Sequence, residues 1–292
     1  MEANMIKTKF AAILGVLIVF AAGCGPEIKK PLKLCPGKAT ADEAIAALGG
    51  QGKNLLPLKA SGNCWYVYDA NGKKHEEQLR VQVRIEPPLN VYVQGSSIIG
   101  KAVELGANDR QFWMALKPKE ISTYIWGQWG DEGVRQCLEK LWLGPNIWLE
   151  AFGVIKPASS ADAAVWELSH EGPFDILSRK DRGGRLTKRV SIYCCDYLVR
   201  KIEYFDEQGR ETAVTELDDY AVVVKGGGWK VPRMVKISGG KQEMVTIELS
   251  DVGKAQFTDK QRQVLFERPK PEGFEHVGKI NSNCEFVEEQ PK

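Results

Sequence analysis

The sequence predicts a mainly β (α+β) domain, built as a single unclosed antiparallel β-barrel or strongly curved sheet with a few helical segments inserted. Two observations support this fold class. Apolar and polar residues alternate in many short runs that are separated by Gly, Pro, Asn and Asp, which is typical of antiparallel strands. Helical spacing occurs in only two or three short places. We therefore expect about 9 to 11 strands and few helices.

The first predicted elements are a helix and a series of strands. Thr40 and Glu43 have the spacing of a capping box, and the apolar residues that follow at helical spacing stop at two glycines, so we expect a helix over residues 40–49. The period then changes to two, because the apolar residues of segment 79–85 alternate with polar ones. Segment 89–93 alternates in the same way, and further short strands follow it.

A helical segment interrupts the strands near the middle of the chain. Apolar residues recur at helical spacing over residues 132–143, and a strongly apolar stretch continues to Phe152. Strands resume near Phe174 and run to Leu249, with glycine-rich turns between them. A last short helix is expected over residues 258–266, where a Thr-Asp pair provides a start signal.

The N-terminus has the pattern of a secretory signal. Lys7 and Lys9 precede 13 residues that are all apolar or small, a run that is short for a membrane span. The run ends in Gly23-Cys24, which resembles the bacterial lipobox, although Ala21 stands where lipoboxes usually carry Leu. This resemblance implies cleavage before Cys24, a lipid on its thiol and an acyl group such as palmitate on the new N-terminus. An uncleaved anchor and a plain secretory signal are the alternatives.

Composition divides the chain into four parts. Residues 1–23 form the predicted signal peptide, and residues 24–38, rich in Pro, Gly and Lys, are predicted to be a flexible tether behind the lipidated cysteine. Residues 39–268 contain the predicted helices and strands as one domain. Residues 269–292 are Pro-rich and charged and are expected to form a C-terminal tail.

Charge and motif content argue against several classes of function. The chain has 40 Lys and Arg against 38 Asp and Glu, and the two signs are interspersed, so no nucleic-acid partner is expected. His75, His170 and His276 do not have metal-ligand spacing, and no nucleophile elbow, phosphate-binding loop or dinucleotide motif occurs. We therefore predict a protein that is not an enzyme and that uses no metal or cofactor.

Six cysteines follow Cys24, and an exported protein could join them in up to three disulfides. Spacing alone leaves every pairing open. Cys194 and Cys195 are adjacent in a predicted strand, so their side chains should point to opposite faces and have different partners, or one should be a buried thiol. The candidate disulfide cysteines are Cys35, Cys64, Cys137, Cys194, Cys195 and Cys284.

The order of the predicted elements is itself informative. A capped helix opens the domain, meander strands and a helical insert follow, and a second meander includes residues 197–210, 217–220 and 231–237. This order resembles the bacterial LolA/LolB lipoprotein-carrier superfamily. The resemblance implies an unclosed barrel in which the helical segments 40–49 and 132–152 form a lid over an apolar hollow that takes acyl chains. The side chains expected to line this hollow are Trp113, Trp126, Trp142, Ile147, Trp148, Leu149 and Phe152. The alternative is that these side chains simply fill the core.

The same resemblance implies a membrane-contact loop and a location. LolB-type proteins are themselves lipoproteins and touch the membrane with an apolar loop between strands. The matching position here holds Ile98 and Ile99, which could equally begin the next strand. Gly25 follows the lipidated cysteine and is not the Asp that retains lipoproteins at the inner membrane, so the resemblance implies the outer membrane, facing the periplasm.

The predicted function is that of a membrane-anchored periplasmic lipoprotein that binds lipid, or the acyl chains of lipoproteins, and acts in their sorting to the outer membrane. Its expected partners are a lipid or an acylated lipoprotein, the membrane through the N-terminal lipid, and other envelope proteins. The alternative is a structural or adaptor lipoprotein that uses the same scaffold with a filled core and no lipid ligand.

Overall fold

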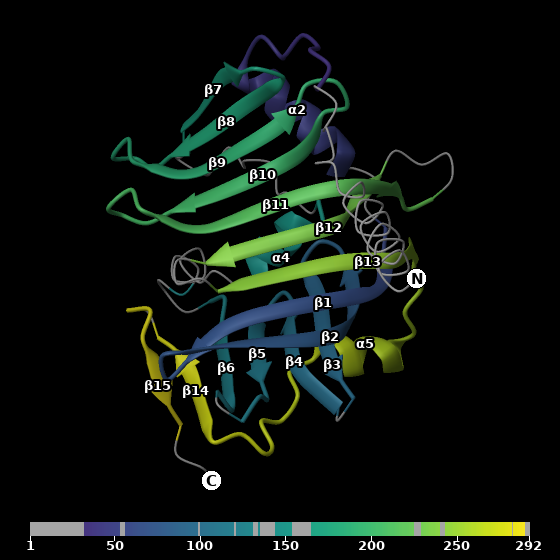
Figure 1. Cartoon of the computed structure of the whole chain (residues 1–292), viewed down its shortest axis with the longest axis vertical. Coiled ribbons are helices and arrows are strands. Elements are labelled where there is room, and N and C mark those ends of the chain that lie inside the picture. Colours follow the sequence, from purple (N-terminus) through teal and green to yellow (C-terminus); the bar gives the residue numbers. More distant parts are fainter. Residues whose placement is uncertain are drawn as a thin grey trace, which may run out of the picture. The chain divides into compact units, whose positions relative to one another are not determined.

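The computed structural model describes residues 32–52, 56–98, 100–119, 121–130, 134, 144–153, 165–224, 229–239, 243–281 and 283–289. The sequence-based predictions for Cys24, Ile99, Cys137 and Trp142 lie outside these residues, as do the predicted signal peptide and most of the helical segment expected over 132–143. Residues Leu34–Lys292 form one compact unit, which Figure 1 shows and which is described here by itself.

One sheet contains all 15 strands of the described residues. In chain order the strands are β1 (Leu58–Ala70), β2 (Lys73–Glu86), β3 (Asn90–Ser97), β4 (Gly100–Ala107), β5 (Gln111–Leu116), β6 (Thr123–Gln128), β7 (Val165–Glu171), β8 (Phe174–Lys180), β9 (Leu186–Tyr193), β10 (Leu198–Phe205), β11 (Glu211–Val222), β12 (Lys230–Gly239), β13 (Met244–Lys254), β14 (His276–Ile280) and β15 (Phe286–Glu288).

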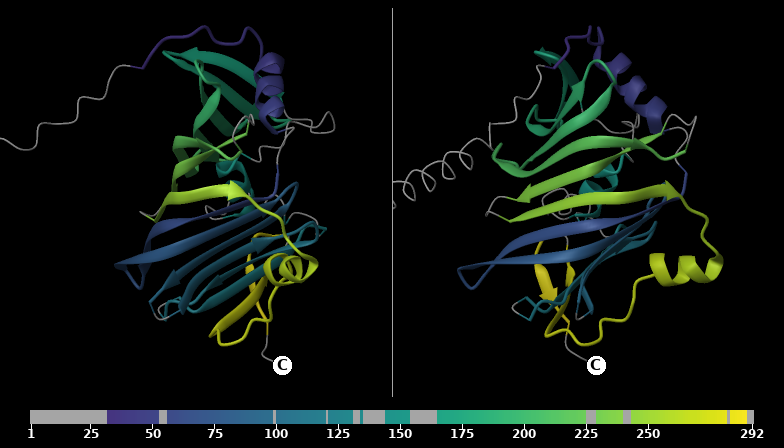
Figure 2. Two further views of the ribbon diagram at one scale, coloured as in Figure 1. Left: turned by 90° about the vertical axis from the view of Figure 1, so that its right-hand side faces the viewer. Right: turned by 45° about the vertical axis from the view of Figure 1, so that its right-hand side comes forward.

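The sheet consists of two antiparallel meanders joined at their long strands. Strands β1 to β6 follow one another in space, as do β7 to β13, and β1 pairs antiparallel with β13 to unite the two series. Near the C-terminus the chain returns and β14 pairs in parallel with β6, while β15 forms the edge beyond it. The other edge is β7, so the sheet stays open. Figure 2 shows how strongly the sheet bends between its two edges.

This architecture confirms the predicted fold class and contains more strands than expected. Strand β7 was missed because its sequence, VWELSHE, has few apolar residues, which fits its place at the edge of the sheet. Strands β14 and β15 lie within residues 269–292, where the sequence suggested a tail. Proline and charged residues lie on both sides of the two short strands, and each strand itself contains a charged residue, so composition concealed them.

Alternation along the strands gives the sheet two different faces. In β2 the side chains of Leu79, Val81, Val83 and Ile85 are buried on one face, whereas Arg80 and its polar neighbours point to the other. We call the face that carries these buried residues the inner face. It holds the main apolar core of the molecule.

Three helices are described. Helix α2 (Ala41–Gly52) packs on β7 and β8. Thr40 caps its start, because Thr40 Oγ1 accepts from the backbone N–H of Glu43, while the Glu43 carboxylate accepts from the N–H of Ala39 instead of that of Thr40, as a capping box would require. Helix α4 (Pro145–Ala151) contacts β3 and β4 as well as β11, so it links strands of both meanders across the inner face. Helix α5 (Asp259–Phe266) has its own capping box at Thr258.

Helix α5 does not belong to the predicted lid. It packs on the opposite, outer face of the sheet, where Phe257 and Phe266 surround the outward side chain of Tyr92 from β3. Helices α2 and α4 lie on the inner face, and residues of both belong to the main core. Among the described residues, no helix combines the length and the apolar character that crossing a membrane requires.

Candidate functional site

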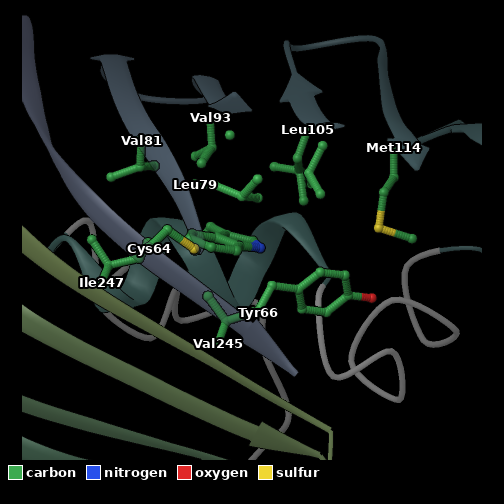
Figure 3. A pocket seen from close by; sticks show the side chains of 12 residues that line it. Cys64, Tyr66, Leu79, Val81, Val93, Leu105, Met114, Val245 and Ile247 are labelled. Atoms are coloured by element: carbon green, nitrogen blue, oxygen red, sulfur yellow. The ribbon is translucent and has the colours of Figure 1, made fainter. Parts of the chain in front are cut away.

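An apolar pocket lies on the inner face, between the first meander, β13 and helix α4. The space between its lining side chains amounts to about 450 Å³ when the open solvent at its mouth is counted. The lining residues are Cys64 and Tyr66 of β1, Leu79 and Val81 of β2, Val93 and Gly95 of β3, Val103 and Leu105 of β4, Met114 of β5, Trp148 of α4, and Val245 and Ile247 of β13 (Figure 3).

The strand pattern explains why this pocket is apolar. Each strand contributes alternate residues to the inner face, and these are aliphatic side chains in β2, β4 and β13. Gly95 pairs with Val81 across β2 and β3, and a Cβ at Gly95 would come within 2.8 Å of the Cδ1 atom of Leu79, its diagonal neighbour. A larger residue at position 95 would therefore take up space in the pocket.

The polar groups of the pocket wall carry no charge at neutral pH. Burial raises the pKa of the Cys64 thiol to about 12, so the thiol stays protonated. Burial, followed by the nearby Glu243 carboxylate, also raises the pKa of Tyr66. Of the twelve lining residues none is Asp, Glu, Lys, Arg or His. The pocket therefore suits an uncharged, mainly hydrocarbon ligand.

Helix α4 closes one side of the pocket and is held by a polar anchor. The carboxylate of Glu150 accepts from Lys188 Nζ of β9 at 2.5 Å and from the hydroxyl of Tyr204 of β10 at 2.6 Å. The side chains of Glu150 and Lys188 are only 16% and 13% exposed. This anchor fixes the helix against the second meander while its apolar side meets the first.

The four residues of segment 147–152 that were predicted to line the hollow are all buried in the core, and one of them also lines the pocket. Trp148 lines the pocket. Ile147, Leu149 and Phe152 are buried in the main core, and the ring of Phe152 lies 6.5 Å from that of Trp148. Trp148 is therefore the α4 side chain that a bound molecule would contact, and the other three support it.

Trp113 and Trp126 do not face the hollow, which corrects their predicted placement. Along β5, Phe112 and Met114 belong to the inner face, so Trp113 points outward and forms a separate cluster with Tyr124. Trp126 is paired with Trp113 across β5 and β6 and lies beside that cluster. The guanidinium of Arg268 sits 4.0 Å above the Trp126 ring. The sequence shows that successive side chains of these strands alternate between the two faces of the sheet, but it does not show which face is the inner one.

Ile98 occupies the position predicted for a membrane-contact loop. It lies in the turn between β3 and β4, and its side chain is fully exposed. Ser97 is the last residue of β3, and Gly100 is the first residue of β4. An exposed isoleucine at a turn is available for contact with an apolar surface.

The cysteines form one disulfide between described residues, Cys35–Cys195, which spans 160 positions of sequence. Cys284 is disulfide-bonded as well. Cys64 and Cys194 are free thiols. The expectation that Cys194 and Cys195 have different fates is confirmed, although both lie in the turn after β9 instead of in a strand.

A buried carboxylate next to this disulfide was not predicted from the sequence. Asp175 of β8 is fully buried and accepts hydrogen bonds from the backbone N–H of Lys38, the ring of His170, the Cys194 thiol and the Tyr197 hydroxyl. Burial alone would raise the pKa of Asp175, but these hydrogen bonds outweigh it and lower the pKa below the ordinary value. The donors come from separate segments of the chain, so no local sequence motif predicts this cluster around Asp175.

No group of three or more metal-ligating side chains is found among the described residues. The hydrogen bonds of Asp175 form a clamp that joins Lys38, at the end of the predicted tether, to β8 and to the turn after β9. It lies in the second meander, whereas the pocket is lined by the first meander, β13 and α4.

Comparisons with known proteins identify similar folds only. No family model matches the chain, and no curated protein matches it. A LolA superfamily protein of Nitrosomonas europaea has a TM-score of 0.48 and 14% identity, over 76% of this chain and 97% of that one. A DUF1329 family protein of Desulfovibrio piger has a TM-score of 0.48 and 10% identity, over 75% and 94%. A domain assigned to an outer membrane lipoprotein-sorting protein of Vibrio parahaemolyticus has a TM-score of 0.48 and 8% identity, over 75% and 94%. All three likenesses concern the fold alone.

Proposed function

We propose that this chain is a lipid-anchored protein of the bacterial cell envelope that binds an acyl chain of a lipid or of an acylated lipoprotein in the inner-face pocket. The observation that carries the proposal is the lining of that pocket, in which aliphatic, aromatic and sulfur-containing side chains leave no charged group. Each buried methylene of a ligand would contribute about 0.8 kcal/mol, so a chain can be held by burial alone.

Two further features support an envelope location. The predicted signal and lipobox support a location outside the cytoplasm, with the N-terminus on a membrane. The Cys35–Cys195 disulfide fits an oxidising compartment.

The fully exposed Ile98 would contact the membrane while an acyl chain passes to or from the pocket. This contact is the role that we propose for the turn in sorting to the outer membrane.

The second candidate is a structural or adaptor lipoprotein that holds no ligand. Ile147, Leu149 and Phe152 favour it, because they are buried in the main core and show that α4 already fills part of the hollow. The two functions differ in whether the remaining space accepts an acyl chain.

The test is displacement of a fluorescent acyl probe from the chain beginning at residue 27, which contains the whole compact unit. Val103 lines the pocket and is only partly buried, so Val103→Trp should fill the pocket near its mouth and weaken probe binding at least tenfold. The matched control is Val264→Trp, at a site 71% exposed on the outer helix α5, which should leave binding unchanged. Equal binding by both variants, or no binding by the wild-type chain, would favour the adaptor function.

A further inference from the structure

Two adjacent cysteines in the turn after β9 lie within reach of one partner. Cys195 is joined to Cys35, whereas Cys194 is a free thiol. The Cα atoms of Cys35 and Cys195 are 5.1 Å apart. Because consecutive Cα atoms are about 3.8 Å apart, the Cα atom of Cys194 lies within about 9 Å of that of Cys35. Disulfides form at Cα separations of about 4.4–6.8 Å, so a small movement of the turn would let Cys35 pair with Cys194 instead.

This exchange of partners would need no oxidant. The Cys194 thiolate would attack the sulfur of Cys35, and the bond between Cys35 and Cys195 would break. Cys195 would leave as a thiolate and take up the proton that Cys194 had lost. One S–S bond forms as another breaks, and the rate depends on how much of Cys194 is ionised, because the thiolate is the nucleophile.

Asp175 acts directly on this nucleophile. The Cys194 thiol donates to Asp175 Oδ1 over 3.3 Å, and the carboxylate is fully buried. Burial opposes ionisation of Asp175, but its hydrogen bonds outweigh burial and hold its pKa below the ordinary value, so the carboxylate is charged at neutral pH. A second negative charge beside it is unfavourable. Burial, followed by the hydrogen bond to Asp175 and by its charge, accordingly raises the pKa of Cys194.

The same carboxylate also holds the segment that carries Cys35. The backbone N–H of Lys38 donates to Asp175 Oδ2 over 2.8 Å, so this segment is bound to one oxygen while the Cys194 thiol is bound to the other. The two possible partners in an exchange are thus fixed on either side of Asp175. Other titratable groups around the carboxylate are His170 of β7, Tyr197 of the same turn, and Glu43 of α2, which acts on Tyr197 through its charge.

We propose that Asp175 selects the disulfide pairing: by binding the Cys194 thiol it keeps Cys35 joined to Cys195, and so keeps residues 35–38 on the second meander. Pairing of Cys35 with Cys194 would take one donor from Asp175 and break the clamp. Asp175 is a positioning residue, because it acts on the disulfide through the Cys194 thiol. The clamp lies apart from the inner-face pocket, so this role does not depend on acyl binding.

The experiment follows Cys194 in the chain beginning at residue 27, which contains the whole compact unit. The rate of alkylation of Cys194 by iodoacetamide is measured against pH, and disulfide-linked peptides are mapped by mass spectrometry after incubation without reductant. In Asp175→Asn, which removes the charge, Cys194 should be alkylated several-fold faster near neutral pH, and its pH profile should move to lower pH. The Cys35–Cys194 peptide should then appear, whereas the wild type should yield Cys35–Cys195.

The matched control is Tyr197→Phe, which removes another hydrogen bond of the same carboxylate and leaves that of Cys194 in place. It should keep the wild-type pairing and alkylation profile. Equal exchange in Tyr197→Phe and Asp175→Asn would mean that loosening of the turn is sufficient, and this result overturns the proposal. An unchanged profile and peptide map in Asp175→Asn overturns it as well.

Should Asp175→Asn not fold, the wild-type chain provides the readout. The alkylation profile of Cys194 in the folded chain must then lie at higher pH than that of the same thiol in the urea-unfolded chain with its disulfides intact. Coincident profiles would show that the folded state does not suppress the thiolate of Cys194, and the proposal would fall.

Discussion

The backbone N–H of Lys38 donates a 2.8 Å hydrogen bond to the carboxylate of Asp175, which lies 137 positions further along the chain. Gly37 makes the approach possible, because a Cβ there would lie 2.1 Å from Asp175 Oδ1. Beside it the Cys35–Cys195 disulfide ties the same segment to the turn after β9. Residues 35–38, the end of the predicted tether, are thus fixed to the second meander.

This clamp predicts a pH-dependent loss of stability in Asp175→Asn. Because hydrogen bonds lower the folded-state pKa of Asp175, the ionised carboxylate stabilises the folded state. That contribution is complete above the unfolded-state pKa of about 4 and disappears as pH falls through the lower folded-state value. At neutral pH the substitution should lower the free energy of unfolding by about 2 kcal/mol.

Urea unfolding between pH 3 and pH 7, values chosen to bracket the ordinary carboxyl range of about 4, measures this effect. The difference between wild type and Asp175→Asn should be constant near neutrality and shrink in acid. Asp109→Asn, at an exposed side chain, is the control and should show little difference at any pH. A difference for Asp175→Asn that did not change with pH would contradict the ionised, hydrogen-bonded state.

The disulfide predicts a large and specific cost for one cysteine of the adjacent pair. Cys195→Ser should lower the free energy of unfolding by about 2–5 kcal/mol, because opening a closed loop of 160 positions restores chain entropy to the unfolded state. Cys35→Ser should have the same effect, and the double substitution no more. Cys194→Ser keeps the disulfide and should cost much less. Equal losses for Cys194→Ser and Cys195→Ser would mean that the pairing is wrong.

The anchor of α4 should be measurable as a coupling energy. Glu150 and Lys188 are both mostly buried, so a double-mutant cycle with Glu150→Gln and Lys188→Met should give a coupling of about 1–3 kcal/mol. The matched control is the pair Glu167 and Lys180, which is more exposed and should couple by less than about 1 kcal/mol. Similar coupling energies for the two pairs would show that α4 is not held through Glu150.

The outward placement of Trp113 predicts the effect of a single methyl group. A Cβ at Gly106 would lie 2.1 Å from Cζ2 of Trp113, so Gly106→Ala should lower the free energy of unfolding by about 1–3 kcal/mol. Gly253→Ala is the control, because nothing lies within 4 Å of a Cβ there, and it should be near neutral. If thermal unfolding showed the two variants to be equally stable, Trp113 would not pack against β4.

The strands with strict alternation were the part of the fold that could be predicted from the sequence. Residues 79–85 have a period of two, and the structure makes them part of β2 with the predicted apolar side buried. The N-cap at Thr40 was equally local and is present, although the Glu43 carboxylate accepts from the N–H of Ala39 and not from that of Thr40. These features depend only on neighbours in sequence, so they can be recognised without knowledge of the fold.

The missed features depend on contacts between distant segments. Trp113 and Trp148 are both apolar and aromatic in sequence, but strand register turns the first outward and the packing of α4 brings the second to the pocket. Asp175 is a single carboxylate in a strand, and its donors become visible only when residues 38, 170, 194 and 197 are brought together. Sequence spacing could not choose among the cysteine pairings for the same reason.

Native mass spectrometry with lipid extraction tests the central claim most directly. The chain from residue 27, purified from a bacterial envelope, should carry phospholipid or acylated peptide in its native spectrum. Val103→Trp should lose that mass, and Val264→Trp should keep it. A clean unliganded mass for the wild-type chain, unchanged when an acylated ligand is added, would contradict acyl binding in the inner-face pocket.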